Sequence, residues 1–319
     1  MSAAANRRLV VALCGGIGGA KLALGLSRVV AGADLMVVAN TGDDFEHLGL
    51  AISPDLDTIM YMLAGLDDPQ RGWGRRNETW TFMSALEALG GETWFALGDG
   101  DLATHVERTR RLRAGEALSA ITADFCRRLG IAARVVPMTD DVVRTRLRTD
   151  EGWLDFQDYF VRRRCAPRVL EVIYDGTARA HADVLAALTD PRLRAVVICP
   201  SNPFLSIEPI LAVPDLREAI ARAAAPVVAV SPIIGGHAVK GPTAKMMSEL
   251  GLEVNAATVA RRYQELLDAY VLDRVDAAEA AKLGIPVTVA HTLMTTLADR
   301  ENLARHVLAS ADALAKATA

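Results

Sequence analysis

The sequence predicts an α/β protein with a Rossmann-like, three-layer αβα core around a mainly parallel sheet. Short apolar runs recur along the chain and alternate with segments whose apolar residues have helical spacing. The runs are apolar at nearly every position, which is typical of strands buried on both faces of a parallel sheet. A glycine-rich loop follows the first run, at a point where open α/β sheets bind ligands.

The first unit of this core is a strand, a loop, a helix and a second strand. Residues 9–13 form a β-prone run that ends at glycines, residues 22–30 place apolar side chains on one helical face, and residues 35–39 form the second run. The last 20 residues are rich in Ala and Leu and predict a terminal helix. Strands of the second half are expected at 196–199, 227–230, 270–272 and 287–290.

The middle of the chain has a different pattern. Residues 57–129 are mostly helical in pattern and broken by glycine-rich loops, whereas residues 142–161 alternate around a turn and predict a β-hairpin. No repeat or linker-like segment is visible. We therefore expect one domain over residues 1–319, with a core at about 8–59 and 166–300 and an inserted helical and hairpin cap region at about 60–165.

Composition excludes several classes of protein. Of 319 residues, 51% are hydrophobic and 23% charged, a balance that excludes a disordered chain or a coiled coil. The net charge of -4 argues against nucleic-acid binding, and no apolar run approaches the roughly 18 residues that span a bilayer. The four cysteines form no CxxC pair, and the apolar run before Cys14 is too short for a signal peptide. We expect a cytoplasmic protein.

The glycine-rich loop at residues 14–21 nearly fits two phosphate-binding templates. A dinucleotide fingerprint fails because Lys21 stands where its last glycine belongs, and a P-loop fails at Ala20 and Leu22. Asn40 also stands where a ribose-binding acid is expected, which disfavours an NAD-dependent dehydrogenase. Glycines before a helix still let backbone N–H groups approach a phosphate, although a tight turn without ligand is the alternative.

Four carboxylates lie within 15 residues of one another beside this loop, at Asp43, Asp44, Asp55 and Asp57. Hard oxygen ligands suit Mg²⁺, which proteins hold with one or two carboxylates plus substrate phosphates. The alternative is that some of these aspartates cap helices. The pattern predicts a Mg²⁺ site formed by these four residues.

Longer motifs then indicate a family. They are Gly-Gly-x-Gly-Gly-Ala-Lys-Leu at 15–22, Asn-Thr-Gly-Asp-Asp at 40–44, Ile-Ser-Pro-Asp-Leu-Asp-Thr at 52–58, Asp-Pro-Gln-Arg-Gly-Trp-Gly at 68–74, Leu-Gly-Asp-x-Asp-Leu-Ala-Thr-His at 97–105, and Pro-Ser-Asn-Pro at 200–203. Together they resemble the 2-phospho-L-lactate transferase family, whose bacterial members are also called phosphoenolpyruvate transferases. The resemblance runs from about residue 8 to 300.

The resemblance implies a step in the biosynthesis of the deazaflavin coenzyme F-420. A phosphorylated three-carbon acid would pass from a guanosine diphosphate-linked donor to the terminal ribityl hydroxyl of the deazaflavin FO, and GMP would leave. The acid could be enolpyruvate, lactate or phosphoglycerate, and the sequence does not choose. The resemblance also implies a homodimer, a state that the apolar helix around Leu303, Val307 and Leu308 favours.

Roles for individual residues follow from the same resemblance. Asp43, Asp55 and Asp57 are expected to be catalytic. The donor is expected at Gly15, Gly16, Gly18, Gly19, Lys21, Asn40, Ser201, Asn202 and Ser231. FO is expected at Asp57, Ala96, Asp99 and His105. Without the resemblance, Ser201-Asn202-Pro203 and Ser231-Pro232 would be ordinary turn starters, and a lone histidine is more often structural than catalytic.

Two features leave questions open. Gly100 stands where the family usually has an arginine, whose role would then be lost or taken by Arg71 or Arg75. Arg108 belongs to a basic run that predicts an exposed helix face. The main alternative function is a non-catalytic nucleotide-sugar-binding regulator of the gluconeogenesis-factor type, which residues 53–58 argue against because that family is expected to lack the acidic pair.

Overall fold

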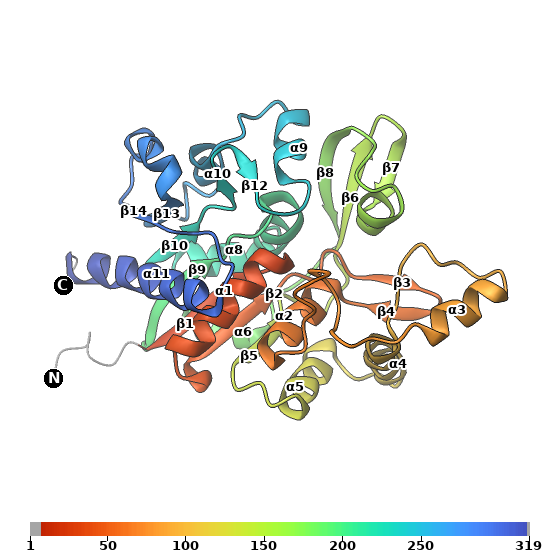
Figure 1. The fold of residues 1–319 in the computed structure, drawn as a ribbon. Helices are drawn as coiled ribbons and strands as arrows, with labels where there is room; N and C mark the ends of the chain where they lie inside the picture. The colour runs from red at the N-terminus through yellow and green to blue at the C-terminus, as the bar shows by residue number, and fades with distance from the viewer. Residues whose placement is uncertain (1–7, 318–319) are drawn as a thin grey trace.

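The computed structural model describes residues 8–317, and a seven-stranded sheet forms its middle layer (Figure 1). The strand order is β14-β13-β10-β9-β1-β2-β5, and every neighbouring pair is parallel. Helices cover both faces, so the predicted αβα fold class is confirmed. The strands are β1 Leu9–Cys14, β2 Leu35–Ala39, β5 Arg134–Pro137, β9 Leu193–Ile198, β10 Val227–Val230, β13 Ala269–Asp273 and β14 Val287–Ala290.

The side chains of β1 show why the sheet is buried on both faces. Val10, Ala12 and Cys14 belong to one hydrophobic cluster, whereas the alternate residues Leu9 and Leu13 belong to the other. The first cluster packs under α1 Gly16–Val29, α2 Pro54–Ala64, α5 Leu118–Arg128 and α11 Leu297–Ala317. The second packs under α6 Ala182–Leu188, α7 Glu208–Leu211, α8 Pro214–Ala221, α9 Thr243–Glu249 and α10 Ala256–Arg262.

Smaller elements extend from one end of this core. A hairpin of β3 Phe45–His47 and β4 Leu50–Ile52 lies near α3 Thr81–Ala88 and α4 Asp99–Arg113, at the right of Figure 1. A separate antiparallel sheet has the order β7-β6-β8, from Gly152–Asp155, Arg144–Thr149 and Val169–Asp175. The hairpin predicted within residues 142–161 is therefore present as β6 and β7. A short pair, β11 Ile233–Ile234 and β12 His237–Ala238, completes the strands.

Two strands differ from the sequence expectation. β5 lies within the range 60–165 that was expected to be an insertion, yet it pairs with β2 as the edge of the central sheet. β8 lies within the expected second part of the core, yet it pairs antiparallel with β6. The division into a core and one inserted cap region stays a prediction. β5, from the expected insertion, pairs with a strand of the core, and β8, from the expected core, pairs with a strand of the insertion.

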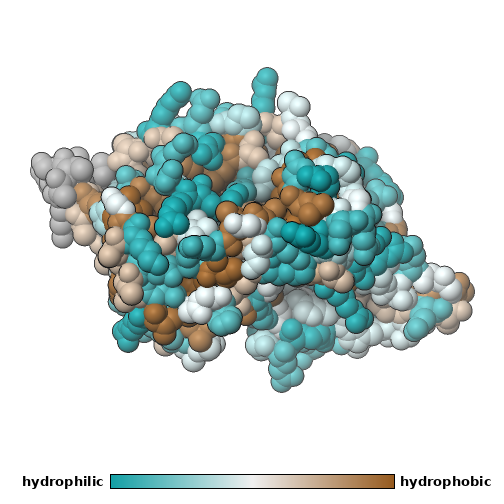
Figure 2. All heavy atoms as spheres, turned by 90° about the horizontal axis from the view of Figure 1, so that it is seen from above, coloured by the Kyte–Doolittle hydropathy of each residue, from teal (hydrophilic) through white to brown (hydrophobic). Residues whose placement is uncertain are grey.

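The terminal helix α11 is buried in its own chain. It packs beside α1, and Leu303 and Val307 are fully shielded from solvent there. These side chains therefore give no support to the predicted dimer. Seen from above, the surface mixes hydrophilic and apolar patches (Figure 2). Within residues 8–317, no helix is both long and apolar enough to cross a membrane.

Candidate active site

A cavity of about 740 Å³ lies where the carboxyl ends of several parallel strands meet the smaller elements. The loops after β1, β2, β9, β10 and β14 all contribute to its lining, as expected for an open α/β sheet. It brings together most of the residues that the sequence indicated. These are Gly15, Gly16, Gly18, Lys21, Asp43, Asp55, Asp57, Ala96, His105, Ser201, Asn202 and Ser231.

The glycine loop packs too closely against its neighbours for any other residue. A Cβ atom at Gly15 would collide with the Asp55 carboxylate and with Ser206, and one at Gly18 would collide with the carbonyl of Pro200. Gly16 has a φ of +60°, in the left-handed region that favours glycine. Gly19 does not line the cavity, because it packs against Ser201 and Cys14 behind the loop.

Asp55 comes from α2 but lies at the N-terminus of α1. Its Oδ1 accepts a hydrogen bond from the backbone N–H of Gly16 at 2.5 Å. Ser201 fixes the preceding residue, since its hydroxyl donates to the Gly15 carbonyl at 2.7 Å. A carboxylate is favourable at a helix N-terminus. Asp55 therefore joins the glycine loop to the acidic cluster.

Asn40 lies behind the cavity wall rather than in it. The side chain is fully buried, and its Nδ2 lies 3.2 Å from Asp43 Oδ1 and 2.9 Å from Asp55 Oδ2. Its Oδ1 accepts a hydrogen bond from the backbone N–H of Gly42 at 2.8 Å. Asn40 was expected to contact the donor, and the structure instead gives it contacts that hold two carboxylates side by side.

Asp43, Asp44 and Asp55 form an acidic group, of which Asp43 and Asp55 are buried and Asp44 is half-buried. None of them makes an ion pair with a described lysine or arginine. Burial raises the pKa of Asp43 well above its usual range, that of Asp44 to about 7 and that of Asp55 to about 6. Asp44 Oδ1 is buried and has no hydrogen-bond partner. Asn40 holds the Asp43 and Asp55 carboxylates side by side, and two carboxylates together with substrate phosphates suit Mg²⁺.

Asp57 was predicted to share a metal with these three aspartates, and its negative charge contributes to the raised pKa of both Asp43 and Asp44. Its carboxylate forms a two-pronged ion pair with Arg108, in which Nη1 donates to Oδ2 at 3.0 Å and Nη2 pairs with Oδ1. Arg108 was expected on an exposed helix face, and only 1% of it is exposed. The expectation was wrong because Asp101, His105 and Arg108 lie four and three residues apart, on one face of α4.

A short chain of polar contacts continues from this pair. His105 Nδ1 lies 3.7 Å from Asp57 Oδ2, and His105 Nε2 lies 3.2 Å from Asp101 Oδ2. The hydroxyl of Tyr61 donates to Asp101 Oδ1 at 2.6 Å. In residues 8–317, Asp57, Asp101 and His105 are the one group of three whose possible metal ligands lie within 4.8 Å of one another. Arg108 already compensates the charge of Asp57, whereas no described lysine or arginine forms an ion pair with Asp43 or Asp55.

Asp99 does not line the cavity, although it was predicted to contact FO. Its carboxylate accepts hydrogen bonds from the backbone N–H groups of Thr81 and Phe82 at 3.2 and 3.1 Å. It therefore caps the first turn of α3 from a neighbouring helix. Ala96 was also expected beside FO, and it does line the cavity.

The region around Gly100 is occupied by Glu78 and Arg75. A Cβ at Gly100 would stand 3.0 Å from a Glu78 carboxylate oxygen and 3.4 Å from Arg75 Cζ, and the Arg75 guanidinium donates to the Gly100 carbonyl at 3.0 Å. Arg75 does not line the cavity, whereas Arg71 does, with its guanidinium over the rings of Trp73 and Trp80. Of the two arginines considered as replacements, Arg71 is thus the one that reaches the cavity.

Asn202 and Ser231 both have local structural roles. Asn202 Oδ1 accepts from the N–H groups of Phe204 and Leu205 at 2.9 and 3.2 Å. The Ser231 hydroxyl accepts from the N–H of Ile233 at 3.1 Å, within a tight turn. Both residues still face the cavity, so turn formation and ligand contact are compatible at these positions.

The comparisons with known proteins agree with one another. A sequence model described as 2-phospho-L-lactate transferase CofD matches residues 10–307. The chain belongs to this family. It is 41% identical to a phosphoenolpyruvate transferase of Streptomyces griseus, over 95% of this chain and 98% of that protein. It is 38% identical to a 2-phospho-L-lactate transferase of Methanosarcina acetivorans, over 94% of this chain and 98% of that protein.

The fold is also similar to that of a solved structure. A member of the UPF0052 family from Bacillus halodurans matches with a TM-score of 0.65 and 13% identity, over 95% of this chain and 99% of that one. This likeness supports the architecture alone. The family membership makes this CofD-family chain a transferase of the phosphoenolpyruvate and 2-phospho-L-lactate transferase class, in coenzyme F-420 biosynthesis.

Proposed function

We propose that this CofD-family enzyme transfers a phosphorylated three-carbon acid from a guanosine diphosphate-linked donor to the ribityl hydroxyl of FO, releasing GMP. The observation that carries this proposal is the meeting of three features in one cavity. A glycine loop at a helix N-terminus, a buried acidic group and an aromatic wall all line it. They suit a diphosphate, a divalent cation and a flat heterocycle respectively.

The glycine loop supports a role in holding the donor. Its backbone lies at the N-terminus of α1, where the helix dipole favours negative charge. Asp43 and Asp55 line the cavity beside the loop, and the Asn40 amide lies against both carboxylates. These two carboxylates would hold Mg²⁺ together with the phosphates of the donor. When bound, the ion would offset the negative charge that develops on the diphosphate as the phosphorus–oxygen bond breaks.

Asp57 supports a role on the acceptor side. The ion pair with Arg108 fixes the orientation of its carboxylate at the cavity wall. A fixed carboxylate can accept a hydrogen bond from the attacking hydroxyl and position it for in-line displacement. Phe156 and Phe160 stack with ring centroids 5.3 Å apart, and with Trp94 and Phe95 they give the cavity flat apolar surfaces.

The test is incubation of the purified chain with FO, Mg²⁺ and a guanosine diphosphate-linked acid. Separate reactions would use enolpyruvate, lactate and phosphoglycerate donors, and mass spectrometry would detect both GMP and FO joined through a phosphodiester to the acid. We expect both products in equal amounts with at least one donor. Tight GDP binding without turnover of any donor would contradict the proposal and favour a nucleotide-sugar-binding regulator. The chain is expected to act in the cytoplasm on small molecules, without nucleic acid.

A further inference from the structure

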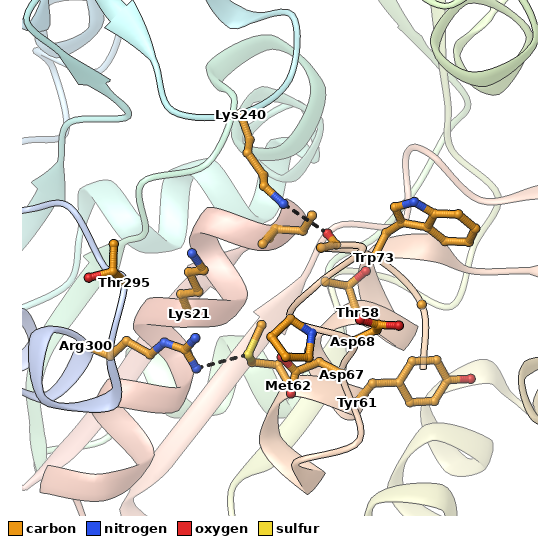
Figure 3. Close-up of a pocket in the computed structure, with 14 residues that line it drawn as sticks. Lys21, Thr58, Tyr61, Met62, Asp67, Asp68, Trp73, Lys240, Thr295 and Arg300 are labelled. Carbon is orange, nitrogen blue, oxygen red and sulfur yellow. Dashed lines mark hydrogen bonds between the residues drawn. The ribbon is translucent and has the colours of Figure 1, made fainter. Parts of the chain in front are cut away.

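A smaller pocket of about 110 Å³ opens beside the glycine loop, next to the main cavity. The two share several lining residues, among them Ile17, Lys21 and Thr58, so the small pocket is a side chamber of the large one. Figure 3 shows Lys240 reaching into it from above, Lys21 from α1 and Arg300 from α11, with Trp73 on the opposite side. Three cationic side chains from distant parts of the sequence thus meet around one small space.

None of these three cations forms an ion pair with a carboxylate among residues 8–317. Lys21 Nζ donates to the carbonyl of Met294 at 2.9 Å, and Lys240 Nζ donates to the carbonyl of Gly72 at 3.3 Å. Arg300 Nη1 contacts only the sulfur of Met62, and its Nε is buried without any hydrogen-bond partner. Burial, with repulsion from Arg300 and Lys240, lowers the pKa of Lys21.

The two aspartates of the pocket are already engaged elsewhere. Asp67 lies 3.9 Å from Arg76, and Asp68 lies 3.3 Å from Arg71 and accepts from the N–H groups of a neighbouring turn. Asp67 offsets part of the charge of Lys21, but neither aspartate forms an ion pair with Lys21, Lys240 or Arg300. Gathering like charges beside an unpartnered guanidinium nitrogen is unfavourable unless an anion binds between them.

The size of the pocket restricts the anion. The pocket has a volume of about 110 Å³, against about 740 Å³ for the main cavity. A carboxylate on a short carbon chain suits it, and the main cavity offers more room for a nucleoside or a tricyclic deazaflavin. The proposed function places the diphosphate between the glycine loop and the acidic group. Among the groups that the proposed substrates carry, the carboxylate of the three-carbon acid is therefore the anion that we assign to this pocket.

We propose that Lys21, Lys240 and Arg300 form a subsite for the carboxylate of the acid carried by the donor. This inference rests on the proposed function, because the donor must carry a three-carbon acid. In this arrangement the acid projects from the diphosphate into the side chamber, away from FO. The subsite makes the enzyme select donors that carry a negative charge at this position, over donors of similar size without one.

The test compares two ligands that differ only in the acid. Calorimetry would measure the dissociation constants of GDP and of GDP esterified to L-lactate, without FO and without turnover, for the wild type and for Lys240→Met and Arg300→Met. Loss of a charged hydrogen-bond partner typically weakens binding by about 10- to 100-fold. We expect such a loss for the lactate-linked ligand in each variant and a change of less than about twofold for GDP. The matched control is Arg305→Met, which removes an exposed charge from the same helix.

A second ligand separates charge from shape. The methyl ester of the lactate-linked donor lacks the carboxylate charge, so wild type and both variants should bind it with equal affinity. Equal losses for GDP and the lactate-linked donor would overturn the proposal and assign the subsite to a phosphate. Unchanged binding of both ligands would also overturn it. Lys240 is exposed, so its variant stays informative if Arg300→Met proves unstable. Failure of the proposed function would appear separately, as wild-type enzyme that yields no FO product.

Discussion

Arg108 is the largest described side chain that is almost fully shielded from solvent. A buried guanidinium is costly unless a carboxylate and further hydrogen bonds compensate its charge. Asp57 provides that compensation, and Arg108 Nη1 also lies 3.3 Å from His105 Nδ1. Asp57 therefore serves the stability of the fold as well as the proposed chemistry, which the sequence did not indicate.

This double role changes the expected effect of Asp57→Asn. We expect turnover to fall by about 10²–10⁴-fold, because the acceptor hydroxyl loses its positioning carboxylate. GDP affinity should hold, because the glycine loop is unaffected. The free energy of unfolding should fall by up to about 3–5 kcal/mol, since Arg108 loses its charge partner in a buried setting. Steady-state kinetics, calorimetry with GDP and chemical denaturation would measure these three effects.

The double variant Asp57→Asn with Arg108→Gln is the control for that prediction. It removes both charges together, so stability should recover while turnover stays low. If turnover recovered along with stability, Asp57 would be a structural residue only, and its assignment to the acceptor would be wrong.

We expect Mg²⁺ to stabilise the folded protein to a degree that depends on pH, because the carboxyls of the acidic group must lose their protons to bind it. Burial raises the pKa of Asp44 to about 7 and that of Asp55 to about 6, whereas both carboxyls have a pKa near 3.8 in the unfolded chain. Between these values the folded protein binds protons that the unfolded chain has already released. The free energy of unfolding of metal-free protein should therefore fall as pH rises from about 4 to 7. Mg²⁺ needs the ionised carboxylates, so it should raise the unfolding midpoint more at pH 8 than at pH 5.5.

Thermal unfolding in EDTA and in Mg²⁺ at the two pH values would measure this difference, with NaCl at matched ionic strength as the control. Activity should also disappear in EDTA and return with Mg²⁺ or Mn²⁺. An equal rise of the midpoint at both pH values, or full turnover in metal-free buffer, would show that these carboxylates do not hold the cation.

Helix α3 depends on the first residue of the helix that follows it, α4. Asp99 caps its first turn, and Thr79 also donates its hydroxyl to the same carboxylate at 2.5 Å. We expect Asp99→Ala to lower the unfolding midpoint slightly, by about a degree or two, because the first N–H groups of α3 lose their acceptor. KM for FO should not change. Thermal unfolding and kinetics with varied FO would test this, and a selective rise in KM for FO would restore Asp99 to the acceptor site.

The elements themselves could be predicted where their pattern was long and uniform. The strand before the glycine loop and the helix after it follow from an unbroken apolar run and from helical spacing, and both are present. β5 was missed because Arg134-Val135-Val136-Pro137 has only two apolar residues before a proline, too short a pattern to suggest a sheet edge. β8 could not be assigned because partner choice depends on long-range packing rather than on local sequence.

Across the whole molecule, the sheet order explains why distant motifs form one site. β1 pairs with β2 on one side and with β9 on the other, so the glycine loop, the acidic group and Ser201 emerge side by side. The motifs predicted which residues would gather there, and twelve of the positions named from the sequence line the cavity. They did not predict the contacts of Asn40 or Arg108, because both depend on the three-dimensional meeting of separate segments.

The predicted homodimer concerns the whole molecule. The resemblance to the family implies a homodimer, but the apolar residues of α11 that favoured it from the sequence are buried against α1. Light scattering at micromolar concentration should give twice the chain mass of 34.1 kDa. Leu303→Ala should lower the free energy of unfolding by about 2–5 kcal/mol through the cavity it leaves, without changing that mass. A single chain mass for the wild type would refute the dimer, and dissociation caused by Leu303→Ala would place α11 at the interface after all.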